Sequence, residues 1–494
     1  MAHTQSLPQR GDAASRFTVL MLWVLLAVFV VYPLVRLLAM AFTADGSFTL
    51  ENLRPFVESW YDRQAAVNSI LLGCSVGVAG TVLGFIFAFA VTRLSLPKWL
   101  CAAVSAVTLL PLISPPFTSS IALTLSLGPN GILLDFFGLG NFNFYGFWGT
   151  FISETLTFFP VAFMTLSTIL ARIDPNLEDA AYSLGASSFK VFRTVTLPLA
   201  APGIANAFLL VFSCSLADFA TPQVLGGHSF PVLPTQAYLV ITGMYDFKGG
   251  AALSFMLLIP AIIVYSLQRW WVGKKSYVTV SGKAGGRSSV KGPGPLLSSV
   301  IVATVAVVIA FILYLYAIIL TGSLVKVWGV NNEITLENYS YVFTHGSKAI
   351  KDTLLIACIG TPLGGLLAVL VGYATARLKV RGSRILETVS LLNYTLPGTV
   401  VGIAYIIAFN DKPIMLTGTI YILVAAYLFR YSSAGIRNVI AALSQIDPSI
   451  EEASRSLGAS SMKTFTSITI PLVLPAILAG MRYLFIHSMT AISA

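Results

Sequence analysis

Two stretches of the sequence decide the architecture. Residues 173–204 read IDPNLEDAAYSLGASSFKVFRTVTLPLAAPGI, and residues 446–477 read IDPSIEEASRSLGASSMKTFTSITIPLVLPAI. They align without a gap, 18 of the 32 positions are identical, and the offset is constant (446 − 173 = 273). A repeat of this kind indicates that the chain contains two copies of one structural unit.

Each copy predicts a short surface helix with a defined start and end. Asp174 and Asp447 each precede a proline, an order that suits the N-cap and the first position of a helix. Gly185 and Gly458 follow where glycine commonly ends a helix. One such helix is also typical of a loop that rests on the membrane surface, but two matched copies favour docking against a partner. Small and apolar residues share one helix face: Leu177, Ala180, Ala181 and Leu184, then Ile450, Ala453, Ser454 and Leu457.

The composition is that of a membrane protein. Of the 494 residues, 56% are hydrophobic and 10% are charged, and the mean hydropathy is +0.83. A soluble domain carries about 25% charged residues, so a soluble globular enzyme is excluded, as is a disordered chain. Continuous apolar runs indicate helical spans. We predict eleven spans, over residues 17–42, 67–92, 99–126, 144–171, 201–221, 251–271, 296–322, 352–376, 386–409, 414–436 and 472–494.

Positive charge follows the topology of these spans. Every second loop is basic, including residues 93–98, 172–193 and 377–384, whereas the loop 43–66 has prominent acidic residues. The positive-inside rule then places the basic loops and the N-terminus in the cytoplasm. The net charge of +10, from 30 Lys and Arg against 20 Asp and Glu, is therefore topological. The expected partner is a lipid bilayer, and no nucleic acid is expected.

The repeat divides the chain into four parts. Residues 1–16 form a cytoplasmic tail, 17–272 the first repeat of six spans, 273–295 a Gly- and Ser-rich cytoplasmic linker, and 296–494 the second repeat of five spans. We expect the last span of the second repeat to be missing from this chain. Both copies have the same orientation, so the fold class is an all-α integral membrane protein whose two parallel repeats enclose a pathway.

Ionisable and helix-breaking residues inside the spans are candidates for the pathway. Glu154 either lines the pathway and attracts a cation, or it pairs with a neighbouring helix or reaches the outer interface. Asp218 suits a gate, a receptor contact or a simple interface position. Pro115 and Pro397 break the third span of each repeat, either at the pathway or as packing kinks. Histidines and cysteines are scattered, so neither a metal site nor a catalytic set is predicted.

The repeated stretch resembles the signature loop E-A-A-x3-G-x9-I-x-L-P of permease subunits of binding-protein-dependent ABC importers. The departures from this pattern keep charge sign or size, and the repeated spans extend the resemblance over nearly the whole chain. The matching residues are Asp179-Ala180-Ala181, Gly185, Val195 and Leu197-Pro198, then Glu452-Ala453-Ser454, Gly458, Ile468 and Ile470-Pro471.

The resemblance implies a fold, a mechanism and partners. The fold is that of a type I ABC importer permease in the bacterial inner membrane, working by alternating access. A cytoplasmic ABC ATPase dimer binds ATP and Mg, and an extracytoplasmic binding protein delivers the ligand. This chain is not an enzyme and needs no cofactor, and it lacks the G-x-x-x-x-G-K-[ST] phosphate loop. The implied ATPase-coupling residues are Glu178, Asp179, Ala180, Ala181, Gly185, Glu451, Glu452, Ala453, Ser454 and Gly458.

Two further stretches bear on the cargo. Residues 218–227 (DFATPQVLGG) and 488–494 (SMTAISA) resemble ferric-iron and 2-aminoethylphosphonate permeases. Ferric iron is the first expectation, and 2-aminoethylphosphonate, thiamine, sulfate or polyamine are the alternatives. An ion-coupled secondary transporter would explain the duplication but not two matched cytoplasmic helices, and it would need more buried carboxylates than Glu154. An integral membrane enzyme would need a convergent catalytic set, which the sequence lacks.

Overall fold

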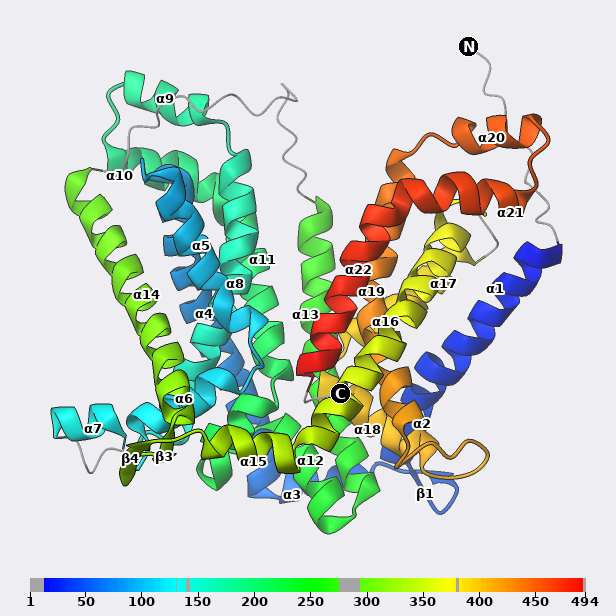
Figure 1. The fold of residues 1–494 in the computed structure, drawn as a ribbon, viewed down its shortest axis with the longest axis horizontal. Coiled ribbons are helices and arrows are strands. Elements are labelled where there is room, and N and C mark those ends of the chain that lie inside the picture. The colour runs from blue at the N-terminus through cyan, green and yellow to red at the C-terminus, as the bar shows by residue number, and fades with distance from the viewer. Residues whose placement is uncertain (1–12, 130, 139–142, 275–293, 379–381, 492–494) are drawn as a thin grey trace. The chain divides into compact units, whose positions relative to one another are not determined.

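The computed structural model describes residues 13–129, 131–138, 143–274, 294–378 and 382–491, and they fold into two units (Figure 1). One unit combines Leu53–Tyr245 with Met256–His345, and we call it the first-repeat unit. The other combines the residues up to Asn52 with Asp246–Phe255 and those from Gly346 onward, and we call it the second-repeat unit. Each name refers to the repeat that supplies most of the unit.

Three long helices form the centre of the first-repeat unit: α4 (Trp60–Arg93), α8 (Phe147–Arg172) and α11 (Leu197–Ala217). Helices α4 and α8 can approach closely because Gly84 has no Cβ atom. A Cβ at this position would lie only 2.6 Å from the Cβ of Ala162. Small residues permit this kind of packing between membrane helices. The other elements are α3 (Arg54–Glu58), α5 (Lys98–Ile113), α6 (Thr118–Leu127), α7 (Ile132–Phe137), α9 (Pro175–Ser183), α10 (Ser188–Val191), α12 (Leu233–Met244), α14 (Pro295–Ser323), α15 (Glu337–His345), the hairpin of β3 (Val325–Val327) and β4 (Asn331–Ile334), and the part of α13 (Phe247–Lys274) from Met256 on.

The second-repeat unit repeats this centre with α16 (Ser347–Ala376), α19 (Ile420–Gln445) and α22 (Ile470–Thr490). The offset of 273 maps the limits of α8 onto those of α19 (147 + 273 = 420; 172 + 273 = 445). The backbones of α19 and α22 meet where Gly435 faces Gly480, a place with no room for a Cβ atom. The other elements are α1 (Ala13–Leu26), α2 (Tyr32–Phe42), the hairpin of β1 (Thr43–Ala44) and β2 (Ser47–Phe48), α17 (Ser383–Thr395), α18 (Gly398–Phe409), α20 (Ser449–Ser456) and α21 (Ser461–Thr464).

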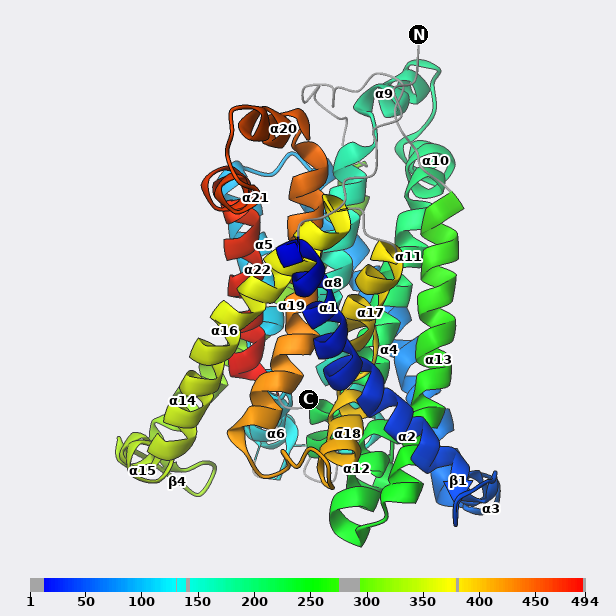
Figure 2. The same ribbon diagram turned by 90° about the vertical axis from the view of Figure 1, so that its right-hand side faces the viewer.

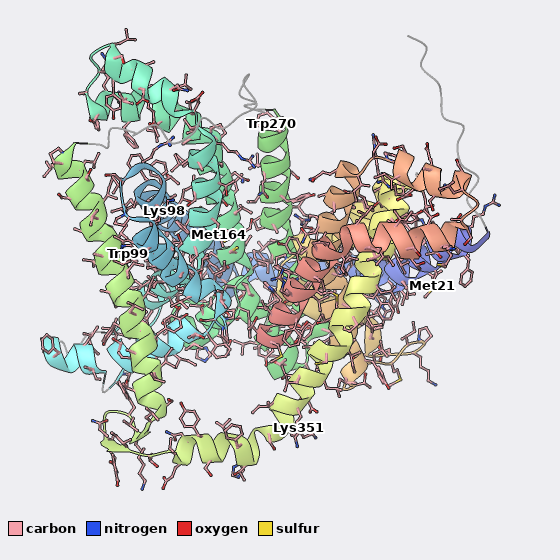
Figure 3. The ribbon with its side chains drawn as sticks, turned by 45° about the horizontal axis from the view of Figure 1, so that its top comes forward. Met21, Lys98, Trp99, Met164, Trp270 and Lys351 are labelled. Carbon is pink, nitrogen blue, oxygen red and sulfur yellow. The ribbon has the colours of Figure 1, made fainter. Side chains whose placement is uncertain are left out.

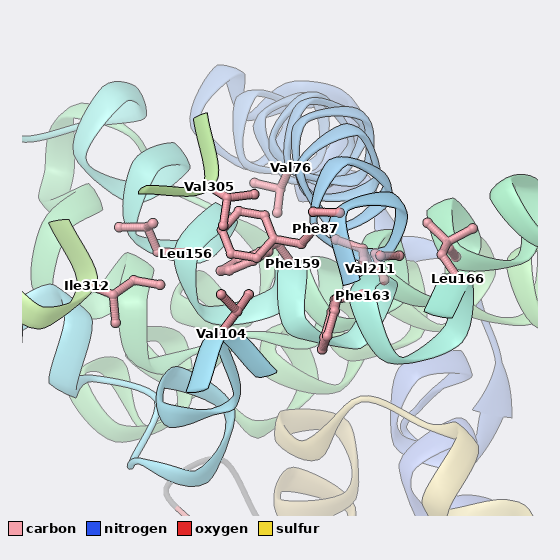
Figure 4. Packing of buried hydrophobic residues seen from close by; sticks show 14 of the residues in the cluster. Val76, Phe87, Val104, Leu156, Phe159, Phe163, Leu166, Val211, Val305 and Ile312 are labelled. Carbon is pink, nitrogen blue, oxygen red and sulfur yellow. The ribbon is translucent and has the colours of Figure 1, made fainter. Parts of the chain in front are cut away.

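Each repeat contributes its first helix to the unit of the other repeat. Val305 and Ile312 of α14 join Phe159 of α8 in one buried cluster (Figure 4). Helices α1 and α2 lie alongside α17 and α18 (Figure 2). There the Tyr405 hydroxyl donates a hydrogen bond of 2.5 Å to the carbonyl of Phe29, in the π-helical turn between α1 and α2. The units therefore do not coincide with the two sequence repeats.

The described helices account for the predicted spans. Eight are long and apolar enough to cross a membrane, and two bent pairs raise the number to ten. The pairs are α5–α6, bent by 96°, and α17–α18, bent by 106°. Their breaks confirm the interruptions predicted at Pro115 and Pro397. The eleventh predicted span corresponds to α19, a helix of 26 residues that is less apolar because it carries Arg430 and Arg437.

Three predicted spans differ most from the observed limits. The span predicted over 414–436 is α19, Ile420–Gln445, because hydropathy favoured the apolar residues before the helix and stopped at Arg437. The span predicted over 201–221 belongs to a helix that runs from Ser188 to Ala217. It ends early because Asp218 has extended backbone angles and its carboxylate accepts a hydrogen bond from the Ala220 N–H.

The last predicted span, 472–494, belongs to a helix that runs from Ser461 to Thr490. Its start was missed because polar residues between Ser461 and Ile470 continue the helix outside the apolar run. Residues 492–494 lie outside the described residues, as do residues 1–12 of the predicted tail and 275–293 of the predicted linker.

Candidate functional site

The first repeated stretch forms α9 with the predicted caps. The Asp174 carboxylate accepts a hydrogen bond of 3.0 Å from the Asn176 N–H, and Pro175 occupies the first helical position. Gly185 follows with φ +81°. The N–H groups of Gly185 and Ala186 donate to the carbonyls of Tyr182 (2.9 Å) and Ala181 (3.1 Å), the pattern of a glycine-terminated helix. The sequence therefore fixes both ends of α9 locally.

The second stretch forms α20 in the same way. The Asp447 carboxylate accepts a hydrogen bond of 2.9 Å from the Ser449 N–H, and this bond lowers the pKa of Asp447 below its usual value. Gly458 ends the helix with φ +88°, and its N–H donates to the Arg455 carbonyl at 2.9 Å. The two surface helices are thus structural copies. In Figure 1, α9 lies beyond the upper ends of α8 and α11, and α20 lies beyond the upper ends of α19 and α22.

The end of the first-repeat unit that carries α9 has the character of a membrane–water interface. Lys98 and Trp99 begin α5 at this end (Figure 3), and the Trp99 side chain is exposed. Tryptophan and lysine are typical anchors at the level of lipid headgroups. We therefore interpret α9 as a helix on the membrane surface, in contact with water.

An apolar patch is exposed on each surface helix. Leu184 and Leu457, at equivalent positions, are each 89% exposed. Each leucine directly follows its surface helix. One further exposed apolar side chain lies in that helix and another in the short helix after it, α10 or α21. Exposed apolar clusters of this kind mark interaction sites. The first apolar patch comprises Leu177, Leu184 and Phe189, and the second comprises Ile450, Leu457 and Met462.

A buried ion pair fixes α9 to the membrane helices. Arg93, the last residue of α4, places its Nε 3.3 Å from Glu178 Oε1, with both side chains at most 5% exposed. This distance suits an ion pair, although the Nε–H does not have hydrogen-bond geometry. The Thr196 hydroxyl donates to the same oxygen at 2.7 Å, and Arg93 Nη2 donates to the Ile173 carbonyl at 3.5 Å. One junction therefore joins α4, the end of α8, α9 and the turn that leads into α11.

The second repeat contains the same junction. Arg377 Nε donates to Glu451 Oε1 at 3.1 Å, and Arg377 Nη2 donates to the Ile446 carbonyl at 2.8 Å. The Thr469 hydroxyl donates to the same Glu451 oxygen at 3.1 Å. Arg455, one turn further along α20, lies 3.7 Å from the other oxygen. Both surface helices are thus held rigidly on the helices that they connect.

These junctions differ from the expectation for Glu178 and Glu451. The sequence places both among residues that dock on a partner, whereas the structure buries them inside the chain. The repeat contained a signal for this arrangement, because both glutamates and both arginines recur at matching places. Among the other expected coupling residues, Ala180, Gly185, Glu452, Ala453 and Gly458 are exposed, whereas Asp179, Ala181 and Ser454 are half-buried.

The pathway candidates Glu154 and Asp218 are both buried in the first-repeat unit. Glu154 on α8 accepts a hydrogen bond from the Ser215 hydroxyl on α11, so it pairs with a neighbouring helix, one of the predicted alternatives. Its second oxygen, Oε1, has no hydrogen-bond partner among the described residues. Asp218 uses Oδ1 to accept the Ala220 N–H at 3.1 Å. Both side chains are at most 8% exposed.

One contributor to the break between α17 and α18 was missed in the sequence. Arg430 of α19 uses Nη1 to donate hydrogen bonds to the carbonyls of Asn393 (3.2 Å) and Leu396 (3.1 Å) at the end of α17. It thereby satisfies carbonyls that the break before Pro397 leaves without helical partners. The available signal was an arginine inside a predicted apolar span.

Comparisons with known proteins show the family of this chain. Residues 80–276 and 360–494 match a family model described as the binding-protein-dependent transport system inner membrane component. The ferric transport system permease protein FbpB of Actinobacillus pleuropneumoniae is 36% identical over 98% of this chain and 72% of its own length. The putative ferric transport system permease protein FbpB 1 of Haemophilus influenzae is also 36% identical, over 98% of this chain and 78% of its own. A chain of a solved bacterial ABC transporter involved in alginate import has a TM-score of 0.45 and 16% identity, over 54% of this chain and 97% of that chain.

Proposed function

Because this chain belongs to the binding-protein-dependent transport system inner membrane components, we propose that it is the permease of an ATP-driven importer of ferric iron. It passes the ligand from an extracytoplasmic binding protein to the cytoplasm by alternating access. The proposed cargo rests on the two relatives named as ferric transport permeases, which align over nearly the whole chain.

The observation that carries the mechanism is the pair of matched apolar patches. Leu184 and Leu457 protrude from helices with defined caps, and each helix is fixed to the spans by a buried ion pair. A rigidly mounted helix transmits a push as a rigid-body movement of the spans that it joins. We propose that each apolar patch docks on one subunit of a cytoplasmic ABC ATPase dimer.

The chain lacks a phosphate loop. The ATPase subunits therefore bind ATP and Mg²⁺, and ATP hydrolysis on them drives transport. The basic loops favour a cytoplasmic position for α9, α20 and the N-terminus, in a bacterial inner membrane. Small residues beside each leucine, Ala180 and Ala453, are also exposed and allow close approach to the ATPase surface.

The proposal is tested by uptake of radiolabelled iron(III) into proteoliposomes that contain the permease and its ATPase, with the loaded binding protein outside. We expect uptake that requires ATP inside and the binding protein outside. Labelled 2-aminoethylphosphonate, offered through its own binding protein, serves as the competing cargo. Uptake driven by an ion gradient without ATPase would contradict the proposal and favour a secondary transporter.

A further inference from the structure

Helix α19 carries two arginines well inside its length, of which Arg430 is half-buried and Arg437 is exposed. Arg430 and Arg437 each lie more than two turns from the nearer end of the helix, at Ile420 and Gln445 respectively. With a rise of about 1.5 Å per residue, these positions are about 15 Å and about 12 Å inside the helix. Arginine in lipid at such a depth is costly, and intramembrane arginines face a protein interior or a water-filled pathway.

Neither arginine has a carboxylate partner in the part of the chain that the structure describes. The ion pairs found there join Arg54 to Glu58, Arg93 to Glu178, and both Arg377 and Arg455 to Glu451. Arg430 uses only Nη1 for its two carbonyl bonds, which leaves Nε and Nη2 for other partners. The guanidinium of Arg437 lies over the Tyr394 ring, 4.6 Å from its centroid. The two positive charges are therefore held in position without being neutralised.

Phenol and imidazole groups gather beside these arginines in the same unit. The His487 ring stacks on the Tyr483 ring at 3.9 Å and lies 5.3 Å from the Tyr431 ring. Tyr483 is in turn 6.5 Å from Tyr394, which Arg437 covers. His487 Nδ1 pairs with the Tyr483 carbonyl at 3.0 Å, so Nε2 is the ring nitrogen that remains for a ligand. Tyr394 is 38% exposed, and Arg430, Tyr483 and His487 are half-buried.

The first repeat has no such group at the equivalent positions. With the offset of 273, the first-repeat residue equivalent to Arg430 is Thr157, the one equivalent to Arg437 is Met164, and the one equivalent to His487 is Cys214. Met164 is an exposed apolar side chain on α8 (Figure 3). Because α8 and α19 form the same helix without sharing these residues, the helix itself does not require the polar group, and only Arg430 has a structural role, at the end of α17. Its presence on one repeat only indicates a role in handling the ligand.

We propose that Tyr394, Arg430, Arg437, Tyr483 and His487 form a binding site for a small oxyanion of the phosphate or carboxylate class on the second-repeat unit. Guanidinium groups bind such anions in bidentate fashion, and phenol O–H groups add further donors, while the His487 ring stacks on Tyr483. Two uncompensated arginines repel a bare trivalent cation. The inference rests on the proposed function and deepens it: the metal crosses this part of the permease together with an oxyanion ligand.

The site is tested by titrating the full chain in lipid nanodiscs, without ATPase, with inorganic phosphate as the probe. We expect saturable binding that R437Q weakens by about tenfold or more, and that R437K restores only in part, because a lysine keeps the charge but not the bidentate geometry. R437Q is the informative variant because it leaves the carbonyl bonds of Arg430 intact. R482Q is the matched control, since Arg482 is an exposed arginine on α22, turned about 100° from Tyr483.

Iron uptake with the ATPase and the binding protein gives the second measurement. We expect R437Q to lower iron uptake at least several-fold while ATP hydrolysis by the assembled importer continues. Absence of phosphate binding to the unaltered chain, or equal weakening by R437Q and R482Q, overturns the site. Failure of the unaltered importer to take up iron contradicts the proposed function instead, and the phosphate titration still decides the site independently.

Discussion

At the scale of single residues, the buried ion pairs Arg93–Glu178 and Arg377–Glu451 are the contacts whose disruption is expected to be costly. E451Q leaves the buried Arg377 without a carboxylate partner, which costs about 3–5 kcal/mol, whereas R377Q leaves Glu451 with only the longer contact to Arg455 at 3.7 Å. We predict that E451Q or R377Q lowers the thermal stability of the purified permease and loosens α20, measured by thermal unfolding and by amide hydrogen exchange of residues 449–456.

The exposed pair Arg54–Glu58 provides the control for this prediction. Its side chains are 68% and 60% exposed, so R54Q is expected to cost less than about 1 kcal/mol. Equal effects of R54Q and R377Q would contradict the view that the buried pair mounts α20.

Gly458 tests backbone conformation apart from packing. Its φ is +88°, and a Cβ atom there would meet nothing within 4 Å. We predict that G458A costs about 1–2 kcal/mol, because an L-residue is strained in the left-handed region. The measurement is hydrogen exchange of α20, and G243A is the control: Gly243 also has open space but lies inside α12 without positive φ. Unchanged exchange in G458A would show that the cap is not strained.

The residue scale also shows what local sequence reasoning missed. The caps at Asp174 and Gly185 depend on near neighbours in the sequence, so they were predictable. The burial of Glu178 depends on Arg93, which lies at the end of a different helix, far away in the sequence. Spacing along one helix indicates which residues share a face, but it does not show which face meets the protein and which meets a partner.

At the scale of elements, the apolar patches on α9 and α20 predict where the ATPase binds. We expect L184E and L457E together to abolish co-purification of the ATPase, because a carboxylate would be buried in an apolar contact without a partner. Both leucines are almost fully exposed, so thermal unfolding of the permease alone stays unchanged. M244E, at an exposed methionine on α12, is the control and should leave ATPase binding intact. Retained binding in the double variant would contradict the docking role.

The Asp447 cap at the start of α20 is predicted to stabilise this helix in a pH-dependent way. The hydrogen bond from the Ser449 N–H lowers the pKa of Asp447 in the folded chain. A lowered folded-state pKa means that the cap contributes fully above the unfolded pKa of about 3.9, and that this contribution is lost as pH falls through the folded pKa. Hydrogen exchange at Ser449, corrected for intrinsic rates, should therefore rise below about pH 4. D447N should remove this dependence, and an identical pH profile in D447N would contradict it.

Elements with strong local signals were predictable, and element limits were less so. Pro397 and the apolar runs on either side predicted the broken span α17–α18. The limits of α19 were wrong because a hydropathy pattern penalises Arg437, whereas the helix continues through it. A membrane helix can contain an arginine if that arginine faces a polar site. Hydropathy does not show which way the side chain faces; the packing of the helices does.

At the scale of the whole molecule, the exchange of first helices predicts that the two repeats hold together without the linker. We expect pieces 1–283 and 284–494, produced together, to co-purify in mild detergent. Helix α14 is buried through Ile312 and Leu315 in the first-repeat unit, and α1 is buried through Leu22 and Leu26 in the second-repeat unit. A second piece that lacks α14 should be retained less well. Separation of the complete pieces in mild detergent would contradict the exchange.

This exchange was beyond the reach of the sequence. The duplication and the in/out pattern of charge indicated two like halves, and the comparisons confirm the repeated permease domain. An apolar helix such as α14 has no polar face to restrict its neighbours, so its sequence does not specify which repeat it packs against. That choice is made by shape, for example by the fit of Val305 and Ile312 beside Phe159.

The central claim is that two rigidly mounted surface helices convert ATP hydrolysis into movement of the spans. The most direct measurement is the number of iron ions taken up per ATP hydrolysed, in proteoliposomes that contain the assembled importer. Compared with the unaltered chain, E451Q should reduce this ratio several-fold while ATPase subunits remain bound and active, because α20 is still present but loosely mounted. An unchanged ratio in E451Q, with stability lowered as predicted, would contradict the claim.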